Sequence, residues 1–324
     1  MTVNVIPFSS TTKGVIACLG AAVLWASNGV VSKHLMNGGV SPFVLAQGRV
    51  TFGAILIAAW LAFTRPKSLV IRGRDIFGFL LLGSLGLAAV NCCYMAAVSK
   101  IPTAAAILLQ YLAPSFIAVY AWRFMGERMG PIKIMALCLA LSGCYLVVGG
   151  YNLNILKLNR WGLIWGLGAA VTFAFYCVTS EYTLRSYSPW TMLCYALIAA
   201  SITFNLVLGP TRLLTIGWDM ESWLLILYSV TVGTIIPFGI FAYGIDHLRA
   251  TRATIISTFE PIAAGVIAYL WLGERLGGLQ MLGGLAVLVA VFLIQKQREY
   301  DQLVPSEVKR AIQETSLRLK DKDK

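Results

Sequence analysis

Two charged residues lie deep inside long apolar stretches of this sequence. Glu260 stands midway along one stretch, directly before Pro261, and Arg49 lies about ten residues into another. On insertion scales, a charge at the centre of an apolar membrane segment costs about 2.5–3.5 kcal/mol, so such residues face a protein interior or a wet cavity. The chemistry that they offer is the binding of a proton, a cation or an anion.

Glu260 suits a site for a proton or a substrate amine. Desolvation favours the neutral form of a carboxyl group, and an arriving ammonium favours the carboxylate. Proton and cationic substrate would then compete for one acid, which is a route to antiport. Pro261 removes a backbone donor and frees a carbonyl near residue 257, which favours a kink that can bind a ligand. The alternative is a carboxyl held in a structural hydrogen bond.

Arg49 leaves two alternatives open. A guanidinium cannot be neutralised in a protein, so it must pair with a carboxylate, carbonyl oxygens, water or a ligand. One interpretation is recognition of a substrate carboxylate. The other is that Arg49 snorkels, or holds together the helix ends nearest to it.

A central tryptophan adds an aromatic surface. Trp25 lies in the middle of its apolar segment, whereas the other tryptophans fall at or within a turn of segment ends, where aromatic belts belong. Asn28, three residues on, shares its helix face. The pair predicts a cavity lining, with packing as the alternative. Six more polar residues extend this lining or form helix–helix hydrogen bonds: Asn91, Tyr94, Gln110, Tyr111, Tyr176 and Tyr243.

Motifs for other chemistries are absent from the sequence. The seven cysteines all fall in apolar segments, there are two histidines, and no CxxC or Cys/His cluster occurs, so we expect neither a metal site nor a cofactor. GxxxxGK[ST], HExxH and GxSxG are also missing, which argues against an ATPase or a hydrolase. An enzyme is therefore not expected.

The elements that position these residues are apolar helices. The chain has 324 residues, of which 58% are hydrophobic and 12% charged. Runs of about 20 apolar residues can cross a hydrocarbon core of about 30 Å. The sequence predicts an all-α membrane protein with ten transmembrane helices, at residues 14–36, 40–64, 75–98, 102–124, 130–149, 160–182, 189–210, 221–245, 250–272 and 277–295.

The distribution of basic residues predicts the orientation. Lys and Arg gather in the segments that share a side with both termini, which predicts that this side is cytoplasmic. These residues are Lys13, Arg65, Lys67, Arg72, Arg74, Arg123, Arg128, Lys133, Arg185, Arg249, Arg252 and those of the C-terminal tail. Fewer lie on the other side: Lys33, Lys100, Lys157, Arg160, Arg212 and Arg275. The net charge of +12 is thereby explained without nucleic acid.

An internal repeat divides the chain into two halves. Leu19-Gly-Ala-Ala-Val returns 148 residues later as Leu167-Gly-Ala-Ala-Val. Tyr111-Leu-Ala-Pro aligns with Thr258-Phe-Glu-Pro, and Gly126-Glu-Arg with Gly273-Glu-Arg, both 147 residues later. We predict a first five-helix repeat at 1–150, a second at 151–296 and a polar cytoplasmic tail at 297–324. Because each repeat has an odd number of helices, the second is inverted, an arrangement suited to alternating access.

The repeat leaves one alternative and one structural expectation. A gene duplication kept for packing alone would produce the same pattern. Ala113, the counterpart of Glu260, is apolar, so a single acid would have to serve both access states. We interpret Glu127 and Glu274, in the Gly-Glu-Arg turns, as structural residues that cap the next helix or pair with a nearby Arg.

These features resemble the drug/metabolite transporter superfamily, and specifically its ten-helix EamA-type exporters. The resemblance rests on Ala21-Ala-Val-Leu-Trp-Ala-Ser-Asn28, on the mid-helix Pro114 and Pro261 as kink sites, and on the two Gly-Glu-Arg turns. It covers residues 14–295. It implies a central cavity lined by helices one, three, four, six, eight and nine, and export of small metabolites such as amino acids, nucleobases, sugars or drugs.

The sequence therefore predicts a secondary active transporter in the plasma or inner membrane that exports a small organic molecule. The alternatives are a transporter of lipids or lipid-linked substrates, an uncoupled facilitator and, less favoured, a membrane enzyme or receptor. The partners we expect are a small-molecule substrate, the lipid bilayer and, if Glu260 titrates, protons. A homodimer is left open, and nucleic acid is not expected.

Overall fold

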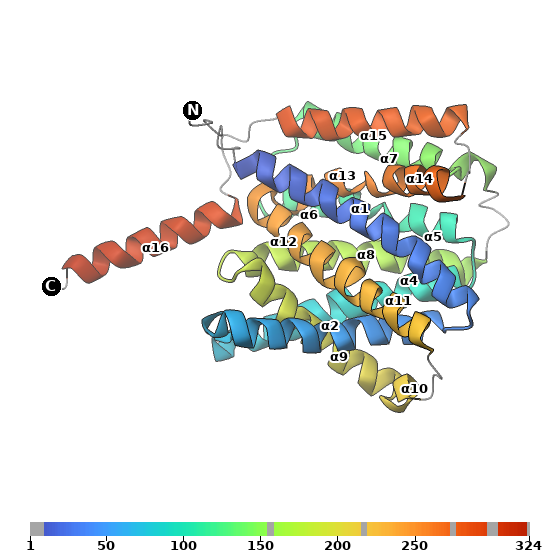
Figure 1. Cartoon of the computed structure of the whole chain (residues 1–324). Coiled ribbons are helices and arrows are strands. Elements are labelled where there is room, and N and C mark those ends of the chain that lie inside the picture. Colours follow the sequence, from blue (N-terminus) through green and yellow to red (C-terminus); the bar gives the residue numbers. More distant parts are fainter. Residues whose placement is uncertain (1–9, 154–158, 215–218, 273–276, 297–303, 323–324) are drawn as a thin grey trace, which may run out of the picture.

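A computed structural model describes residues 10–153, 159–214, 219–272, 277–296 and 304–322. Lys157, Glu274 and Arg275 lie outside these ranges. The described residues are helical throughout and contain no strand (Figure 1). Eight helices are long and apolar enough to span a membrane, and a ninth apolar helix, Pro131–Val147, is shorter. The remaining span, ninth in chain order, is built from two shorter helices at 250–272.

The first half contains five spans. They are α1 (Ser10–Asn37); α2 (Pro42–Thr64); α3 (Ile76–Leu81) continued by the π-helical turn η3 (Leu82–Ala88) and α4 (Ala89–Val98); α5 (Thr103–Gln110) with α6 (Ala113–Phe124); and α7 (Pro131–Val147). Three 3-10 turns lie in the connections: η1 (Pro66–Leu69), η2 (Gly73–Asp75) and η4 (Gly150–Asn152).

The second half repeats this plan. Its spans are α8 (Arg160–Leu184); α9 (Pro189–Leu208); α11 (Met220–Val230) continued by the π-helical turn η6 (Thr231–Ile235) and α12 (Ile236–Leu248); α13 (Ala250–Ser257) with α14 (Glu260–Leu272); and α15 (Gly278–Lys296). A short α10 (Thr211–Leu214) precedes the third of these, and α16 (Pro305–Lys322) follows the last.

Local signals in the sequence explain where the helices begin. Proline occupies one of the first two positions of α2, α6, α7 and α9, where its missing N–H costs nothing. Asn159 caps α8 by accepting from the backbone N–H groups of Trp161 and Gly162, and Asp219 caps α11 through Ser222. Hydrogen bonds from Ser222 lower the pKa of Asp219.

All ten predicted spans are confirmed as helical segments, with ends that shift by only a few residues. The helices are interrupted at equivalent positions in the two repeats. The fourth span breaks at Tyr111 and Leu112, and the ninth at Thr258 and Phe259, each just before a proline. The third and eighth spans both contain a π-helical turn. Both π turns contain glycine and a hydroxyl side chain (LGSLGLA in η3 and TVGTI in η6), a composition that does not by itself predict a π turn.

Helix packing shows that the two repeats are inverted copies of each other. α1 packs along α12, and its counterpart α8 packs along α4, the counterpart of α12. α2 packs on α9 and α7 on α15, so these helices meet their own counterparts, and α6 of the fourth span packs on α13 of the ninth (Figure 1). The chain is thus an all-α membrane protein of ten spans in two inverted five-helix repeats.

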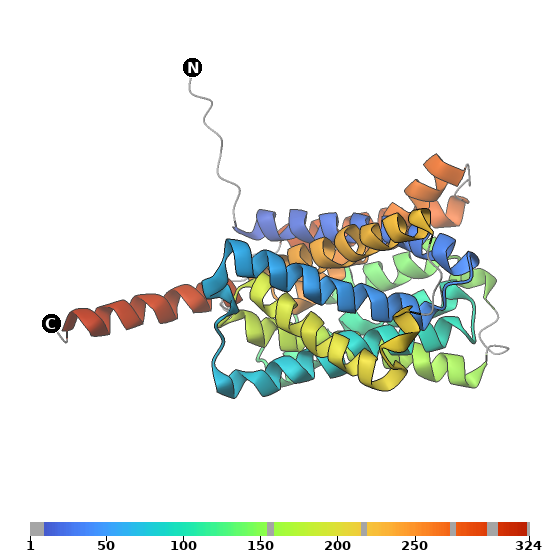
Figure 2. The same ribbon diagram turned by 60° about the horizontal axis from the view of Figure 1, so that its bottom comes forward.

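One end of the bundle carries the start of α1 and the end of α15, and we call it the terminal end. Helix α16 projects from this end, away from the bundle, in both ribbon views (Figures 1 and 2). The largest apolar core cluster runs through the bundle to this end, where it includes Leu184, Leu248 and Ile294. We call the other end, where α1 meets α2, the distal end.

Candidate functional site

Glu260 lies where the ninth span is broken. It is the first residue of α14, after the two residues that separate α14 from α13. All eight residues of α13 are buried, so this half-helix runs through the interior of the bundle. The carboxyl group is half-buried, at the N-terminal end of α14, where the helix dipole favours negative charge.

Tyr111 meets Glu260 from the break in the fourth span. The Tyr111 hydroxyl lies near the Glu260 carboxyl. Tyr94 in α4 and Cys144 in α7 are close enough to interact electrostatically with Glu260. The two broken helices, which are related by the repeat, therefore bring one acid and one phenol together, and α4 of the third span adds a second phenol. This arrangement can hold a proton or an ammonium group.

Trp25 belongs to a closed ring of five aromatic side chains. Its ring centroid lies 5.1 Å from that of Phe238 and 5.1 Å from that of Phe241, with edge-to-face geometry. Tyr176 joins Phe238 at 5.8 Å, and Phe173 joins Tyr176 at 6.3 Å and Phe241 at 6.2 Å. Trp25 Nε1 is buried and has no hydrogen-bond partner within the described part of the chain. That donor is free to serve a ligand.

Asn28 and Tyr176 occupy equivalent positions in the two halves, and each packs closely against a glycine. Asn28 is 4% exposed, and its Oδ1 accepts a 2.7 Å hydrogen bond from Ser229. A Cβ on Gly233, in the π turn η6, would overlap the Asn28 amide. Tyr176 is fully buried, and a Cβ on Gly86 in η3 would lie 3.1 Å from Cβ of Tyr176. For Asn28 these contacts favour the packing alternative. The Tyr176 hydroxyl has no hydrogen-bond partner within the described residues, so a part for Tyr176 in the cavity lining stays a prediction.

Arg49 also binds a π turn. Its Nε donates to Thr234 Oγ1 at 2.9 Å, and its Nη2 donates to the Gly233 carbonyl at 3.1 Å. A π-helical turn leaves carbonyl groups without the usual helical donor, and the guanidinium supplies one. This geometry favours the interpretation that Arg49 holds two helices together.

The remaining polar residues are less closely tied to Glu260. Asn91 lies one turn before Tyr94 and donates a 2.7 Å bond to the Leu87 carbonyl of its own helix. Gln110 precedes Tyr111 at the end of α5 and is half-buried. Tyr243 stacks on His247, with centroids 4.1 Å apart, near the terminal end of α12. Tyr243 thus lies away from the breaks that hold Glu260.

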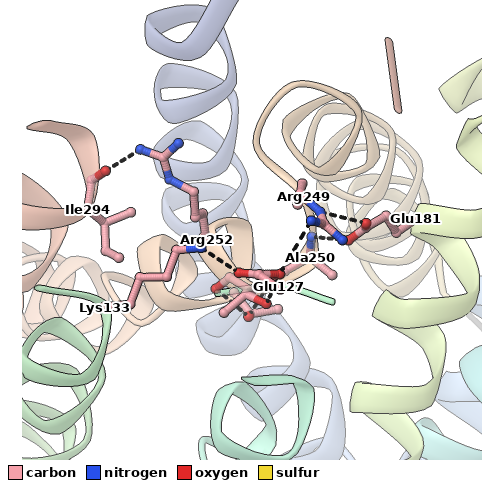
Figure 3. A network of polar contacts seen from close by, with 9 residues as sticks. Glu127, Lys133, Glu181, Arg249, Ala250, Arg252 and Ile294 are labelled. Carbon is pink, nitrogen blue, oxygen red and sulfur yellow. Dashed lines mark hydrogen bonds and ion pairs between the residues drawn. The ribbon is translucent and has the colours of Figure 1, made fainter. Parts of the chain in front are cut away.

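A buried group of charges at the terminal end was not predicted as a unit. We call it the ionic cluster: Glu127, Lys133, Glu181 and Arg249, each 3% exposed or less (Figure 3). Glu127 was expected to be structural, and it accepts a 2.8 Å hydrogen bond from Lys133 Nζ. From the sequence, Lys133 and Arg249 predict only which side of the membrane is cytoplasmic. The sequence signal for this cluster is Glu181, an acidic residue near the end of an otherwise apolar helix.

Glu181 holds an unusual backbone junction between α12 and α13. Its carboxylate accepts from Arg249 Nε at 2.9 Å and from the backbone N–H of Ala250 at 2.8 Å. Arg249 has φ 72°, and it is the only non-glycine residue with positive φ within the described residues. Such a conformation costs on the order of 1–3 kcal/mol and persists where the surroundings fix it.

Helix α16 is attached to the same end. Lys309 Nζ lies 3.0 Å from Asp246 Oδ1 and donates to the Tyr187 carbonyl at 3.2 Å. The Tyr187 hydroxyl donates to Asp75 at 2.5 Å. Burial and the hydrogen bond to Asp75 raise the pKa of Tyr187, so its hydroxyl stays protonated and can donate.

The model of the EamA-like transporter family matches the chain twice, over residues 12–149 and 160–295. The chain belongs to the EamA-like transporter family. An uncharacterized inner membrane transporter, YicL of Salmonella typhimurium, is 28% identical over 294 residues, covering 88% of this chain and 96% of the relative. A probable terminal-alkyne amino-acid exporter of Streptantibioticus cattleyicolor is 28% identical over 291 residues, covering 88% and 94%.

A solved crystal structure supports the same fold for this EamA-like transporter. It superposes with a TM-score of 0.73 at 18% sequence identity and covers 87% of this chain and 96% of its own. With ten apolar spans and membership of this family, the chain is a multi-pass membrane transporter. The acid-and-phenol group at the two helix breaks is its candidate binding site.

Proposed function

We propose that this transporter is a proton-coupled exporter of a small amphipathic metabolite that carries an amine, such as an amino-acid-like compound. The observation that carries the proposal is the meeting of Glu260 and Tyr111 at the breaks of the ninth and fourth spans, with Tyr94 of α4 beside them. Broken helices in inverted-repeat transporters form substrate sites near the bilayer midplane. The amino-acid exporter among the relatives supports this substrate class.

The roles divide between polar and aromatic groups. Glu260 binds either the proton or the substrate ammonium, and the two phenols orient its carboxyl group. The aromatic ring around Trp25 receives the apolar part of the substrate, and the free Trp25 Nε1 offers a donor. Alternating access follows from rocking of two groups of packed helices, each of which contains helices from both repeats, 1–150 and 151–296. The basic residues at the terminal end support a cytoplasmic location for this end.

Proteoliposomes test the coupling. Vesicles loaded with a panel of amino acids and aliphatic amines are placed in buffers of equal or lower pH that contain the same compounds at the same concentration, and each compound is followed by mass spectrometry. We expect at least one compound to leave against its own concentration gradient only when the outside is acidic. Flux that merely equilibrates the compounds would indicate an uncoupled facilitator, and translocation of a labelled phospholipid alone would indicate the lipid transporter.

A further inference from the structure

The ionic cluster joins two sides of the bundle. On one side α12 packs with α1, and α11 packs with α2; we call this the α12 side. On the other, α8 packs with α4, α5 and α6; we call this the α8 side. Arg249 follows the last residue of α12 and belongs to the α12 side. Its partners Glu181, in α8, and Glu127, just after α6, belong to the α8 side. Arg249 therefore bridges the two sides between two carboxylates.

The contacts across this junction are short and buried. Arg249 Nε is 2.9 Å from Glu181 Oε1, and Arg249 Nη1 is 3.9 Å from Glu127 Oε2. Thr251, two residues after Arg249, donates to the same Glu127 oxygen at 3.1 Å. Nearby, Arg252 donates to the Ile294 carbonyl at the end of α15 (Figure 3). The terminal end is thus tied together by charge.

The distal end is built differently. By the repeat, Pro102 corresponds to Arg249, Gln280 to Lys133 and Lys33 to Glu181. The residues at these three distal positions therefore cannot form the same ion pairs. Buried apolar residues form two separate clusters there. One belongs to the α12 side and consists of Leu35, Leu45, Ile226 and Val230. The other belongs to the α8 side and consists of Ala97, Ile101, Ala105 and Ala106.

We infer that the ionic cluster is the gate of the terminal end, in which Arg249 locks the α12 side to the α8 side while the distal end is separated. This inference rests on the alternating access proposed above. It adds an asymmetry that the repeat alone does not contain: the terminal gate is ionic, whereas within the described residues of the distal end the counterparts of Arg249, Lys133 and Glu181 carry different side chains. Without substrate, the protein favours the state with the terminal end closed.

Charges suit a contact that must open and close. Burying an ion pair costs much of what its Coulomb attraction returns, and separation in water restores the hydration of each charge. Paired and separated states can therefore lie close in free energy.

The backbone of Arg249 gives the gate a second element. Its positive φ is retained while Glu181 binds both the guanidinium and the N–H of Ala250. Release of Glu181 allows this junction to relax, which would reorient α13, the half-helix that leads to Glu260. The gate and the binding site are then mechanically connected through one buried helix.

Distances between spin labels test the gate without any substrate. Labels at Lys13→Cys and Phe124→Cys span the two sides at the terminal end, and labels at Asn37→Cys and Lys100→Cys span them at the distal end; all four residues are exposed. The accessible native cysteines are replaced by serine. We compare the wild type with Arg249→Gln and with Arg249→Gln/Glu181→Gln, which removes one charge of each sign.

We expect both variants to raise the ratio of open to closed terminal ends by about tenfold. The terminal pair should gain longer distances, and the distal pair shorter ones. Glu221→Gln is the matched control, because the Glu221 side chain is 71% exposed at the distal end, and it should keep the wild-type distributions. Folded variants with wild-type distances would overturn the gate. So would failure of the double variant to fold, since the cluster would then serve folding.

The result is independent of the transported compound. If the distances shift but no amine in the panel is transported, the gate stands and the proposed function falls. If the wild type transports an amine and the variants keep wild-type distances, the function stands and the gate falls.

Discussion

Asn28 lies against the backbone of Gly233 so closely that any side chain at position 233 would displace it. The same relationship recurs between Tyr176 and Gly86 in the other half, at positions shifted by the repeat. Each pair joins the first span of one half to the π turn in the third span of the other half. The π turns are therefore fixed points at which the two repeats are held together.

Gly233→Ala should destabilise the protein, because the added methyl group has no space beside Asn28. The expected loss is about 1–3 kcal/mol, typical of overpacking. Thermal unfolding in detergent, followed by tryptophan fluorescence, measures it. Gly29→Ala is the control, since nothing lies within 4 Å of a Cβ at that helical position. A control that unfolds as readily as Gly233→Ala would contradict the packing explanation.

Arg49→Gln should lower stability without changing the preference for a substrate carboxylate. Loss of the guanidinium leaves the buried Thr234 hydroxyl and the Gly233 carbonyl without their donor, at about 1–3 kcal/mol. Transport of an amino acid and of its methyl ester separates the two interpretations. If the ratio of their transport rates changes tenfold while the melting temperature stays constant, Arg49 binds the substrate.

Trp25→Phe should keep the aromatic ring cluster and remove only the unpartnered indole N–H. We expect near-wild-type thermal stability and a rise in the KM for transport of about two- to tenfold, the size of one hydrogen bond. Trp25→Ala, in contrast, also removes the contacts with Phe238 and Phe241. An unchanged KM in a stable Trp25→Phe protein would assign Trp25 to packing.

The orientation has a direct test in intact cells. Asn37 and Arg72 are exposed at opposite ends of the bundle. An impermeant thiol reagent added outside should label Asn37→Cys and leave Arg72→Cys unlabelled until the membrane is permeabilised. Labelling of Arg72→Cys in sealed cells would reverse the assignment and place both termini outside.

The sequence was sufficient for the fold because apolar length, prolines and the repeat are all local or periodic signals. It was less informative about the site. Whether Asn28 faces a cavity or a neighbouring helix depends on the rotation of α1 against the π turn, which no local pattern encodes. The ionic cluster shows the same limit, since Glu127, Glu181 and Arg249 lie far apart in sequence and meet only through helix packing. Glu260 stood out from the sequence because a carboxylate is rare in such a segment.

Glu260→Gln is the most direct test of the central claim, that this acid couples protons to substrate. The variant keeps the shape of the side chain and cannot exchange a proton. Initial transport rates in proteoliposomes should vary steeply with pH for the wild type and be flat for Glu260→Gln, with any remaining flux driven by the substrate gradient alone. Glu260→Asp, shorter by one methylene, should retain partial pH-dependent activity. A stable Glu260→Gln protein that transports with the wild-type pH profile would contradict the account and make Glu260 a structural residue.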